Sequence, residues 1–273
     1  MYLRYLFANR PFGPEEQLPC DKGLDILTGG QHMYGYAFLP GGRAGEKAPC
    51  VILLHGLPGY TQNQDIGQAL RRLGFVVMHL FYRGAWGSQE NFSLTGMVQD
   101  VESAVRWCGS RDASDIYGID GDRVFLLGIS MGGWAAIHGL CLCPQVKGAV
   151  AIAPADIGYL NRAQPQLFEN AYRKYGCLRI ETPEALPEEA KRCQYSLGIM
   201  SRTAELKDRP LLMIGGSRDT VVPPEDTLVP FWKALQQNGA ADKKFIILNT
   251  GHSFADCRME LTRVIAQWLS GHI

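Results

Sequence analysis

Short runs of apolar residues recur along the chain, and amphipathic segments separate them. A run of this kind is typical of a β-strand that is covered on both faces of a sheet. The runs are residues 50–54, 75–80, 124–127, 146–152, 211–214 and 245–248. Between them, apolar residues at helical spacing predict helices over 65–73, 97–107, 226–237 and 254–269. This alternation predicts an α/β fold with a doubly wound, mostly parallel sheet and helices on both faces.

The first 40 residues depart from this alternation. Gly29 and Gly30 separate two strand patterns, over 24–27 and 33–39. Two strands joined through a pair of glycines predict an antiparallel hairpin, and the N-terminal position predicts that it lies at a sheet edge.

Residues 154–209 also depart from the alternation, because they contain no pattern of a buried strand. An aromatic, charged and helical segment of this length between two core strands predicts a lid or cap over the strand ends. Its seven basic and seven acidic side chains between residues 155 and 205, Glu189 among them, predict solvated helix faces. We therefore expect one domain over residues 1–273, with 154–209 as an insertion.

Charge and cysteine content argue against several classes of partner. The 27 basic and 27 acidic residues cancel, so no overall field attracts nucleic acid or an anionic membrane. No apolar run approaches the ~20 residues of a membrane span, and the first ten residues do not fit a signal peptide. The eight cysteines are scattered without zinc-ribbon spacing. The sequence therefore predicts a cytoplasmic protein with free thiols that requires no metal or cofactor.

The main chemical signal follows the apolar run 124–127, where the sequence reads Gly128-Ile129-Ser130-Met131-Gly132. This G-x-S-x-G pattern is typical of a nucleophile elbow, in which a strand turns directly into a helix. Side chains at the two glycines would collide in such a turn. The Ser130 hydroxyl then stands clear of the sheet, and the Met131 amide at the helix N-terminus can face a developing oxyanion.

Two further residues follow strand patterns and complete the chemistry that a serine nucleophile needs. Asp219 comes shortly after the run 211–214, and His252 comes after the run 245–248. Because parallel strands end at the same edge of a sheet, we expect both residues to lie near Ser130. The order serine, acid, histidine is that of a hydrolase triad.

Other interpretations of these residues remain open from the sequence. Asp219 could be a turn or capping residue, with Asp156 or Asp226 as the acid instead. His252 could cap the last helix.

The loop after the run 50–54 is the expected source of a second oxyanion donor. It reads His55-Gly56-Leu57-Pro58-Gly59-Tyr60, and its glycines allow the backbone to approach a ligand. We expect the Leu57 amide to act beside that of Met131. His55 is expected to tie the loop down through its ring, and Tyr60 to form part of a substrate wall.

Aromatic residues near the expected strand ends are candidates for substrate binding. Trp86 and Trp134 could line an apolar acyl pocket together with Phe81 and Tyr82, or they could be core residues. Tyr60 and Tyr159 of the insertion are the other candidates for substrate binding. Arg83 is expected to bond loop carbonyls beneath the site.

Six segments together resemble the α/β-hydrolase superfamily, most closely the catalytic domains of the prolyl oligopeptidase and dienelactone hydrolase group. They are residues 55–56, 82–88, 118–124, 128–133, 217–219 and 251–252, and the resemblance spans about residues 48–270. It implies an eight-stranded, mostly parallel α/β-hydrolase sheet with a helical lid. It also implies that Ser130, Asp219 and His252 form the triad and that the amides of Leu57 and Met131 form the oxyanion hole.

Departures from that group point to the substrate. Residues 1–47 are too few for the propeller that filters substrates in its peptidases, no acidic pair for a substrate amino terminus is evident, and a serine stands where dienelactone hydrolases have cysteine. We therefore expect a hydrolase of small to medium carboxylic esters or thioesters. A small-peptide or aminoacyl hydrolase is the second hypothesis, and a non-catalytic binding protein with this fold is the third.

Overall fold

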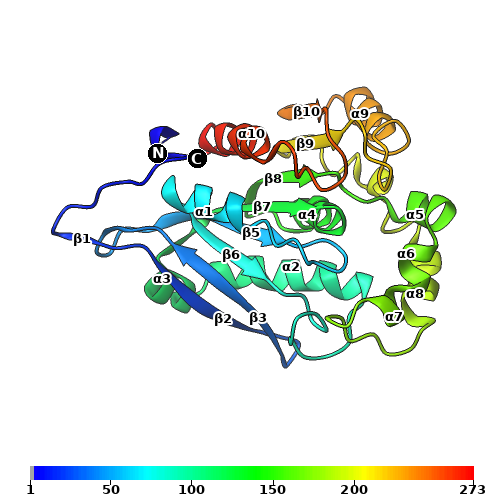
Figure 1. The fold of residues 1–273 in the computed structure, drawn as a ribbon, viewed down its shortest axis with the longest axis horizontal. Helices are drawn as coiled ribbons and strands as arrows, with labels where there is room; N and C mark the ends of the chain where they lie inside the picture. The colour runs from blue at the N-terminus through cyan, green and yellow to red at the C-terminus, as the bar shows by residue number, and fades with distance from the viewer. Residues whose placement is uncertain (1–2) are drawn as a thin grey trace.

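An eight-stranded sheet in the order β10-β9-β8-β7-β5-β6-β3-β2 forms the centre of the structure, a computed structural model that describes residues 3–273 (Figure 1). The strands are β2 (Cys20–Thr28), β3 (Gln31–Leu39), β5 (Ala48–Leu54), β6 (Val76–Leu80), β7 (Ile119–Ile129), β8 (Val146–Ile152), β9 (Leu211–Gly216) and β10 (Lys243–Leu248). The six strands from β5 to β10 are parallel, and β2 and β3 form an antiparallel hairpin at one edge. The predicted sheet and its edge hairpin are thus confirmed.

Alternate residues of the central strands enter two separate cores, as the pleat of a strand requires. On one face, Val51 and Leu53 pack in the core that contains α1 (Gln64–Arg72) and α10 (Arg258–Ser270). On the other face, Ile52 and Leu54 pack in the core of the remaining large helices. These are α2 (Leu94–Cys108), α3 (Arg111–Tyr117), α4 (Met131–Leu142) and α9 (Leu228–Gln237). Burial on both faces explains the continuously apolar patterns of these central strands. The run 245–248 is different: β10 lies at the sheet edge and exposes Ile247, so the expectation that this strand is covered on both faces is wrong.

Helix boundaries differ from the predicted ones where capping decides them. The helix predicted over 97–107 begins at Leu94, because the Ser93 hydroxyl accepts a hydrogen bond of 3.0 Å from the Gly96 amide. The helix predicted over 254–269 begins only at Arg258, because Phe254 has a φ of 54° and interrupts the helical geometry.

The insertion 154–209 consists of short helices gathered at one end of the sheet (Figure 1). They are α5 (Ile157–Ala163), α6 (Gln166–Glu169), α7 (Ala171–Lys174), α8 (Ala185–Cys193) and the 3-10 helix η2 (Ile199–Arg202). The absence of a regular strand from these residues agrees with the sequence pattern. The role of the insertion as a lid stays a prediction.

Glu189 shows that the insertion is bonded to the core rather than solvated throughout. Its side chain accepts hydrogen bonds from the amides of Leu94 and Thr95 at 2.8 and 3.0 Å, and from the Thr95 hydroxyl at 2.6 Å. Only 6% of this residue is exposed. The prediction that Glu189 lies on a solvated face is therefore wrong. Its carboxylate reaches from α8 of the insertion to the N-terminus of α2 and caps that helix.

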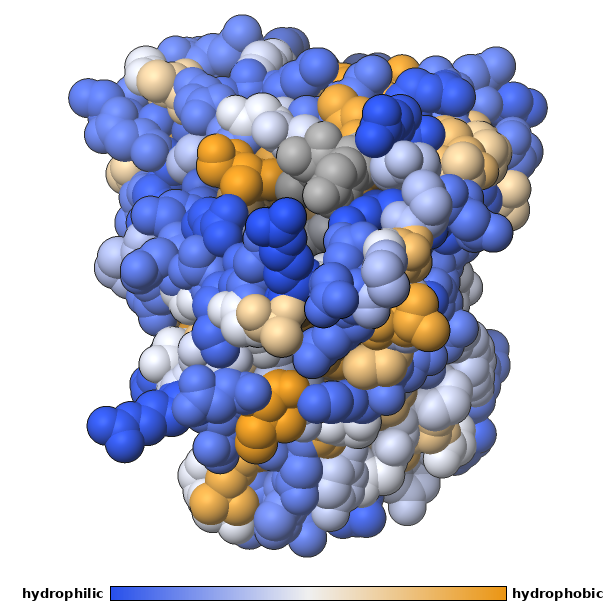
Figure 2. Space-filling model, turned by 90° about the vertical axis from the view of Figure 1, so that its left-hand side faces the viewer, coloured by the Kyte–Doolittle hydropathy of each residue, from blue (hydrophilic) through white to orange (hydrophobic). Residues whose placement is uncertain are grey.

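The end of the molecule opposite the insertion carries a cavity of about 900 Å³. Its lining includes Ala48, Val76 and Gly118, at or just before the amino ends of β5, β6 and β7. Hydrophobic residues are scattered in small patches among hydrophilic ones on this face (Figure 2). Ligands of doubly wound sheets bind beyond the carboxyl ends of the strands, so this cavity is on the wrong side for that chemistry. Within residues 3–273, no helix is long and apolar enough to cross a membrane.

Three buried histidines predict a loss of stability in mild acid. Burial lowers the pKa of His55, His79 and His138 to about 4. Unfolded histidine has a pKa of about 6.5, so between these values the unfolded chain binds more protons and stability falls as pH falls. We expect the free energy of unfolding in urea to be lower at pH 5 than at pH 7, by up to about 2 kcal/mol per histidine.

His79→Phe provides the matched test of this pH effect. It keeps an aromatic ring between Tyr36 and Phe38, whose centroids lie 4.4 and 4.8 Å from that of His79, and should remove about one third of the difference between pH 7 and pH 5. Equal unfolding free energies of the wild type at the two pH values would contradict the prediction.

Candidate active site

Ser130 occupies a strained turn between β7 and α4. Its φ of 57° and ψ of −122° are rarely adopted by a residue with a side chain. The backbone holds this conformation from both sides, because the Ser130 amide donates to Ile152 O at 2.8 Å and the Ser130 carbonyl accepts from Trp134 and Ala155 at 3.0 Å each. The side chain is partly exposed at the carboxyl end of β7.

The two glycines of the motif are required by close backbone contacts. A Cβ on Gly128 would lie 2.1 Å from Gly132 O, and a Cβ on Gly132 would lie 2.0 Å from Leu54 O. The first contact lets α4 begin directly behind the strand, and the second lets α4 pack on the end of β5. The local sequence therefore produces the elbow geometry that the motif predicts.

Asp219 and His252 are joined by a hydrogen bond at the carboxyl ends of β9 and β10. His252 Nδ1 donates to Asp219 Oδ2 at 2.7 Å, and the other carboxylate oxygen accepts from the amides of Val221 and Val222 at 2.8 and 2.9 Å. The Asp219 side chain is fully buried, whereas that of His252 is one-quarter exposed. Because the carboxylate can only accept, the proton of the neutral ring lies on Nδ1, and Nε2 is left free to accept a proton.

Backbone hydrogen bonds connect the loops that carry the three candidate residues. The Ser130 amide donates to the end of β8, the Ala153 amide donates to Ile214 O of β9 at 2.7 Å, and the Ser217 amide donates to Leu248 O of β10 at 2.8 Å. Successive strand ends are thus held together at one edge of the sheet. Within residues 3–273 the Ser130 hydroxyl itself has no hydrogen-bond partner.

Neither alternative acid contacts His252 within residues 3–273. Asp156 caps α5 by accepting from the Tyr159 amide at 2.7 Å, and it also accepts from the Ile199 amide at 3.1 Å. Asp226 is exposed, and its side chain makes no hydrogen bond to His252 in the described part of the chain. Asp219 is the carboxylate that contacts the histidine.

The loop after β5 passes directly beside Ser130. A Cβ on Gly56 would lie 3.3 Å from Ser130 Cβ. Neither the Leu57 amide nor the Met131 amide donates a hydrogen bond within the described part of the chain. Met131 is the first residue of α4, where amides lack an intrahelical acceptor.

His55 fixes the orientation of the peptide that carries the Leu57 amide. Its Nδ1 donates to Gly56 O at 2.8 Å, and this carbonyl belongs to the same planar peptide as the Leu57 N–H. Burial lowers the pKa of His55 to about 4, so the ring is neutral at pH 7. Because the Gly56 carbonyl can only accept a hydrogen bond, Nδ1 carries the proton of the ring. The expectation that His55 ties down the loop agrees with this contact.

The candidate aromatic residues lie in three different settings. Tyr60 is 61% exposed, and its ring meets those of Trp86 and Tyr175 edge-on, with centroids 5.9 and 6.5 Å away. Burial and the charges of Asp226 and Asp219 raise the pKa of Tyr159, which is partly exposed in α5.

Trp134 differs from its expected position on a pocket wall. It is fully buried in the core and donates its indole N–H to Leu197 O at 2.6 Å. The insertion covers this part of α4, and the sequence of α4 alone does not show that contact.

Tyr175 and the amides of Val221 and Val222 were not predicted from the sequence. Tyr175 lies in the irregular insertion, where no strand or helix pattern indicates which way a side chain points. The valine amides act through the backbone, so no residue type marks them. Within residues 3–273, no group of three or more histidine, cysteine, aspartate or glutamate side chains is arranged to hold a metal ion.

Comparison with known proteins identifies related chains. The sequence profile of the alpha/beta hydrolase family matches residues 51–263. Dipeptidyl aminopeptidase BIII of Pseudoxanthomonas mexicana is 25% identical over 232 residues, which are 78% of this chain and 31% of that protein. The chain therefore spans about a third of the length of this curated relative.

Solved structures show the same fold at low sequence identity. An esterase of Pyrococcus furiosus superposes with a TM-score of 0.69 and 19% identity, over 93% of this chain and 92% of its own. The acylaminoacyl peptidase of Pyrococcus horikoshii superposes with a TM-score of 0.70 and 18% identity, over 94% of this chain and 42% of its own.

Substitution of Gly132 tests the packing of the elbow. Helix propensity alone favours alanine over glycine by about 1 kcal/mol, but the clash with Leu54 O opposes it. We expect Gly132→Ala to lower the free energy of unfolding by roughly 3 kcal/mol or more. The matched control is Gly176→Ala, where a Cβ would meet nothing within 4 Å. Equal urea midpoints for the two variants would show that the close approach is not required.

Proposed function

This chain belongs to the alpha/beta hydrolase family, and we propose that it is a serine hydrolase that cleaves small to medium carboxylic esters or thioesters. The observation that carries the proposal is the 2.7 Å bond from His252 to buried Asp219 at the sheet edge that also holds the strained Ser130. These are the groups that acyl transfer to a serine requires, and they follow β7, β9 and β10 at one edge of the sheet.

The proposed reaction begins when His252 Nε2 takes the proton of the Ser130 hydroxyl. The serine oxygen attacks the carbonyl carbon, and the tetrahedral intermediate collapses when the imidazolium returns the proton to the leaving alcohol or thiol. Water then attacks the acyl-enzyme with His252 as base, which releases the acid. Asp219 stays ionised and stabilises the charged imidazole.

The oxyanion of the intermediate is proposed to bind the amides of Leu57 and Met131. Among the residues that the structure describes, neither amide has an acceptor, and the two amides flank Ser130 from the β5 loop and from the start of α4. Oriented donors of this kind lower the barrier because they need no reorganisation as charge develops.

Carboxylates that are already engaged favour an ester over a peptide substrate. An aminopeptidase needs a free acidic group to bind the substrate's amino terminus. Both oxygens of Asp156 accept backbone hydrogen bonds, and so do both oxygens of Glu189. An amine would have to share these carboxylate oxygens with the backbone amides that they already bind.

A small-peptide or aminoacyl hydrolase is the second candidate. The relative named a dipeptidyl aminopeptidase supports it, as does Asp226, an exposed carboxylate whose charge raises the pKa of Tyr159. Asp226 could pair with a substrate amine beside the triad.

A substrate panel tests both candidates together. We expect wild type to hydrolyse p-nitrophenyl esters with an optimum acyl length, and Ser130→Ala to lose about 10³-fold or more of that turnover. Ser103→Ala, in the middle of α2, serves as the serine control and should retain activity. Faster Ser130-dependent cleavage of aminoacyl p-nitroanilides than of esters would favour the peptidase. Full ester turnover by Ser130→Ala would contradict the mechanism, and silence on both substrates would favour a binding protein.

A further inference from the structure

Trp86 contacts the backbone of the oxyanion loop, residues 55–60 after β5, which carries the proposed oxyanion donor Leu57. Its indole Nε1–H donates to Pro58 O at 3.2 Å, one residue beyond the Leu57 amide. Trp86 itself has a φ of 53°, in the left-handed region that a residue with a side chain rarely adopts. A conformation of this kind persists only where the surrounding structure holds it.

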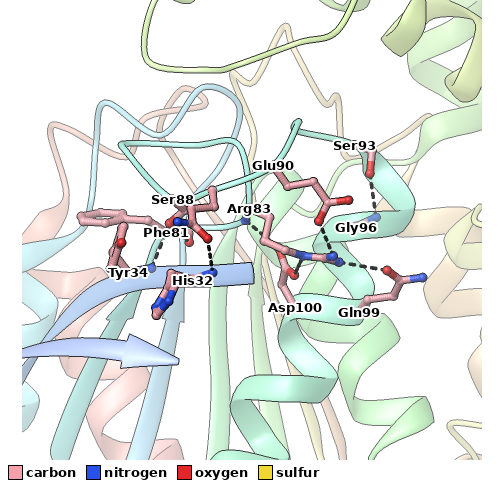
Figure 3. A network of polar contacts seen from close by, with 11 residues as sticks. His32, Tyr34, Phe81, Arg83, Ser88, Glu90, Ser93, Gly96, Gln99 and Asp100 are labelled. Carbon is pink, nitrogen blue, oxygen red and sulfur yellow. Dashed lines mark hydrogen bonds and ion pairs between the residues drawn. The ribbon is translucent and has the colours of Figure 1, made fainter. Parts of the chain in front are cut away.

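The loop between β6 and α2, which carries Trp86, is fixed to α2 on one side (Figure 3). Arg83 points toward α2, where its Nε donates to Asp100 Oδ1 at 2.5 Å and its amide donates to Asp100 Oδ2 at 2.7 Å. Its other guanidinium nitrogens donate to Glu90 at 2.7 Å and to Gln99 at 2.9 Å. Arg83 was expected to bond carbonyls, but its acceptors are side-chain oxygens. Asp100 is fully buried, so this pair fixes the start of the loop to the core.

The same loop is fixed to the sheet on its other side (Figure 3). The Ser88 hydroxyl donates to Phe81 O at 2.8 Å and accepts from the Tyr34 amide of β3 at 2.9 Å. Ser88 is buried. Trp86 thus lies between two anchored residues, Arg83 and Ser88.

The insertion completes the support of Trp86. The Trp86 amide donates to Cys177 O at 2.8 Å, and the Arg179 amide donates to Gly84 O at 2.6 Å. Cys177 also directs its thiol at Pro58 O, at 3.8 Å. The Pro58 carbonyl therefore receives one donor from the β6–α2 loop and one from the insertion.

We propose that Trp86 is a positioning residue that holds the oxyanion loop through the Pro58 carbonyl. His55 fixes the Gly56–Leu57 peptide, and Trp86 fixes the Pro58 carbonyl, one residue further along the chain. With both ends held, the Leu57 amide stays aimed at the position where the oxyanion forms. This inference rests on the proposed function, because it assigns a role in the same acyl transfer.

The expected effect is on kcat more than on KM, because the oxyanion exists only after attack. Loss of one direct oxyanion donor costs about 10²–10³-fold in kcat. Loss of a group that only aligns such a donor should cost less, and we expect about tenfold with KM within about twofold.

The experiment measures kcat and KM for a p-nitrophenyl ester with wild type, Trp86→Phe and Trp107→Phe. Trp107 lies in α2 and packs edge-on against Tyr117 at 5.2 Å, so it controls for the same substitution away from the site. A second variant replaces Trp86 by benzothienylalanine, which keeps the bicyclic ring and substitutes sulfur for the N–H. This variant isolates the hydrogen bond even if Trp86→Phe folds poorly.

The outcomes separate this inference from the proposed function. A tenfold fall in kcat for both Trp86 variants, with Trp107→Phe unchanged, supports the positioning role. Wild-type kcat in the benzothienylalanine variant would overturn it while leaving the serine mechanism intact. Wild type without Ser130-dependent turnover would instead overturn the proposed function, and the positioning role with it.

Discussion

The close approach of the start of α4 to the ends of β7 and β5 is the constraint on which the candidate site depends. Only hydrogen atoms fit at Gly128 and Gly132, where a Cβ would lie within about 2 Å of backbone oxygens. This approach forces Ser130 into its strained conformation and places the Met131 amide at the start of α4, where it has no acceptor in the part of the chain that the structure describes. The hydrogen bonds from Ser130 to β8, from Ala153 to β9 and from Ser217 to β10 then bring the loops of Asp219 and His252 into register with the serine.

The insertion is bonded to the core through buried groups at several places. Glu189 caps α2, and Leu197 O accepts from Trp134 at 2.6 Å and from His138 at 3.0 Å. Residues 177–179 pair with the loop that carries Trp86. These contacts give the insertion a part in shaping the site, because they reach the N-terminus of α2, the buried face of α4 and the oxyanion loop.

Much of the fold and of the candidate triad could be predicted because both depend on local sequence patterns. Continuous apolar runs mark strands buried on both faces, and parallel strands place the residues that follow them at one edge, so Asp219 and His252 could be expected near Ser130. Positions that depend on packing between distant segments could not be predicted. Glu189 is a charged residue on an amphipathic helix, and it becomes a buried cap only because the N-terminus of α2 packs against it. Trp134 likewise is a core residue only because the insertion covers it.

Covalent trapping reports directly whether Ser130 is a nucleophile that the Asp219–His252 pair activates. The folded protein is treated with a fluorophosphonate, digested, and mapped by mass spectrometry. We expect one adduct per chain, on the peptide that contains Ser130, with labelling strongly slowed in His252→Ala and absent after unfolding. An adduct on another residue with Ser130 unmodified, or no adduct on the folded protein, would contradict this expectation.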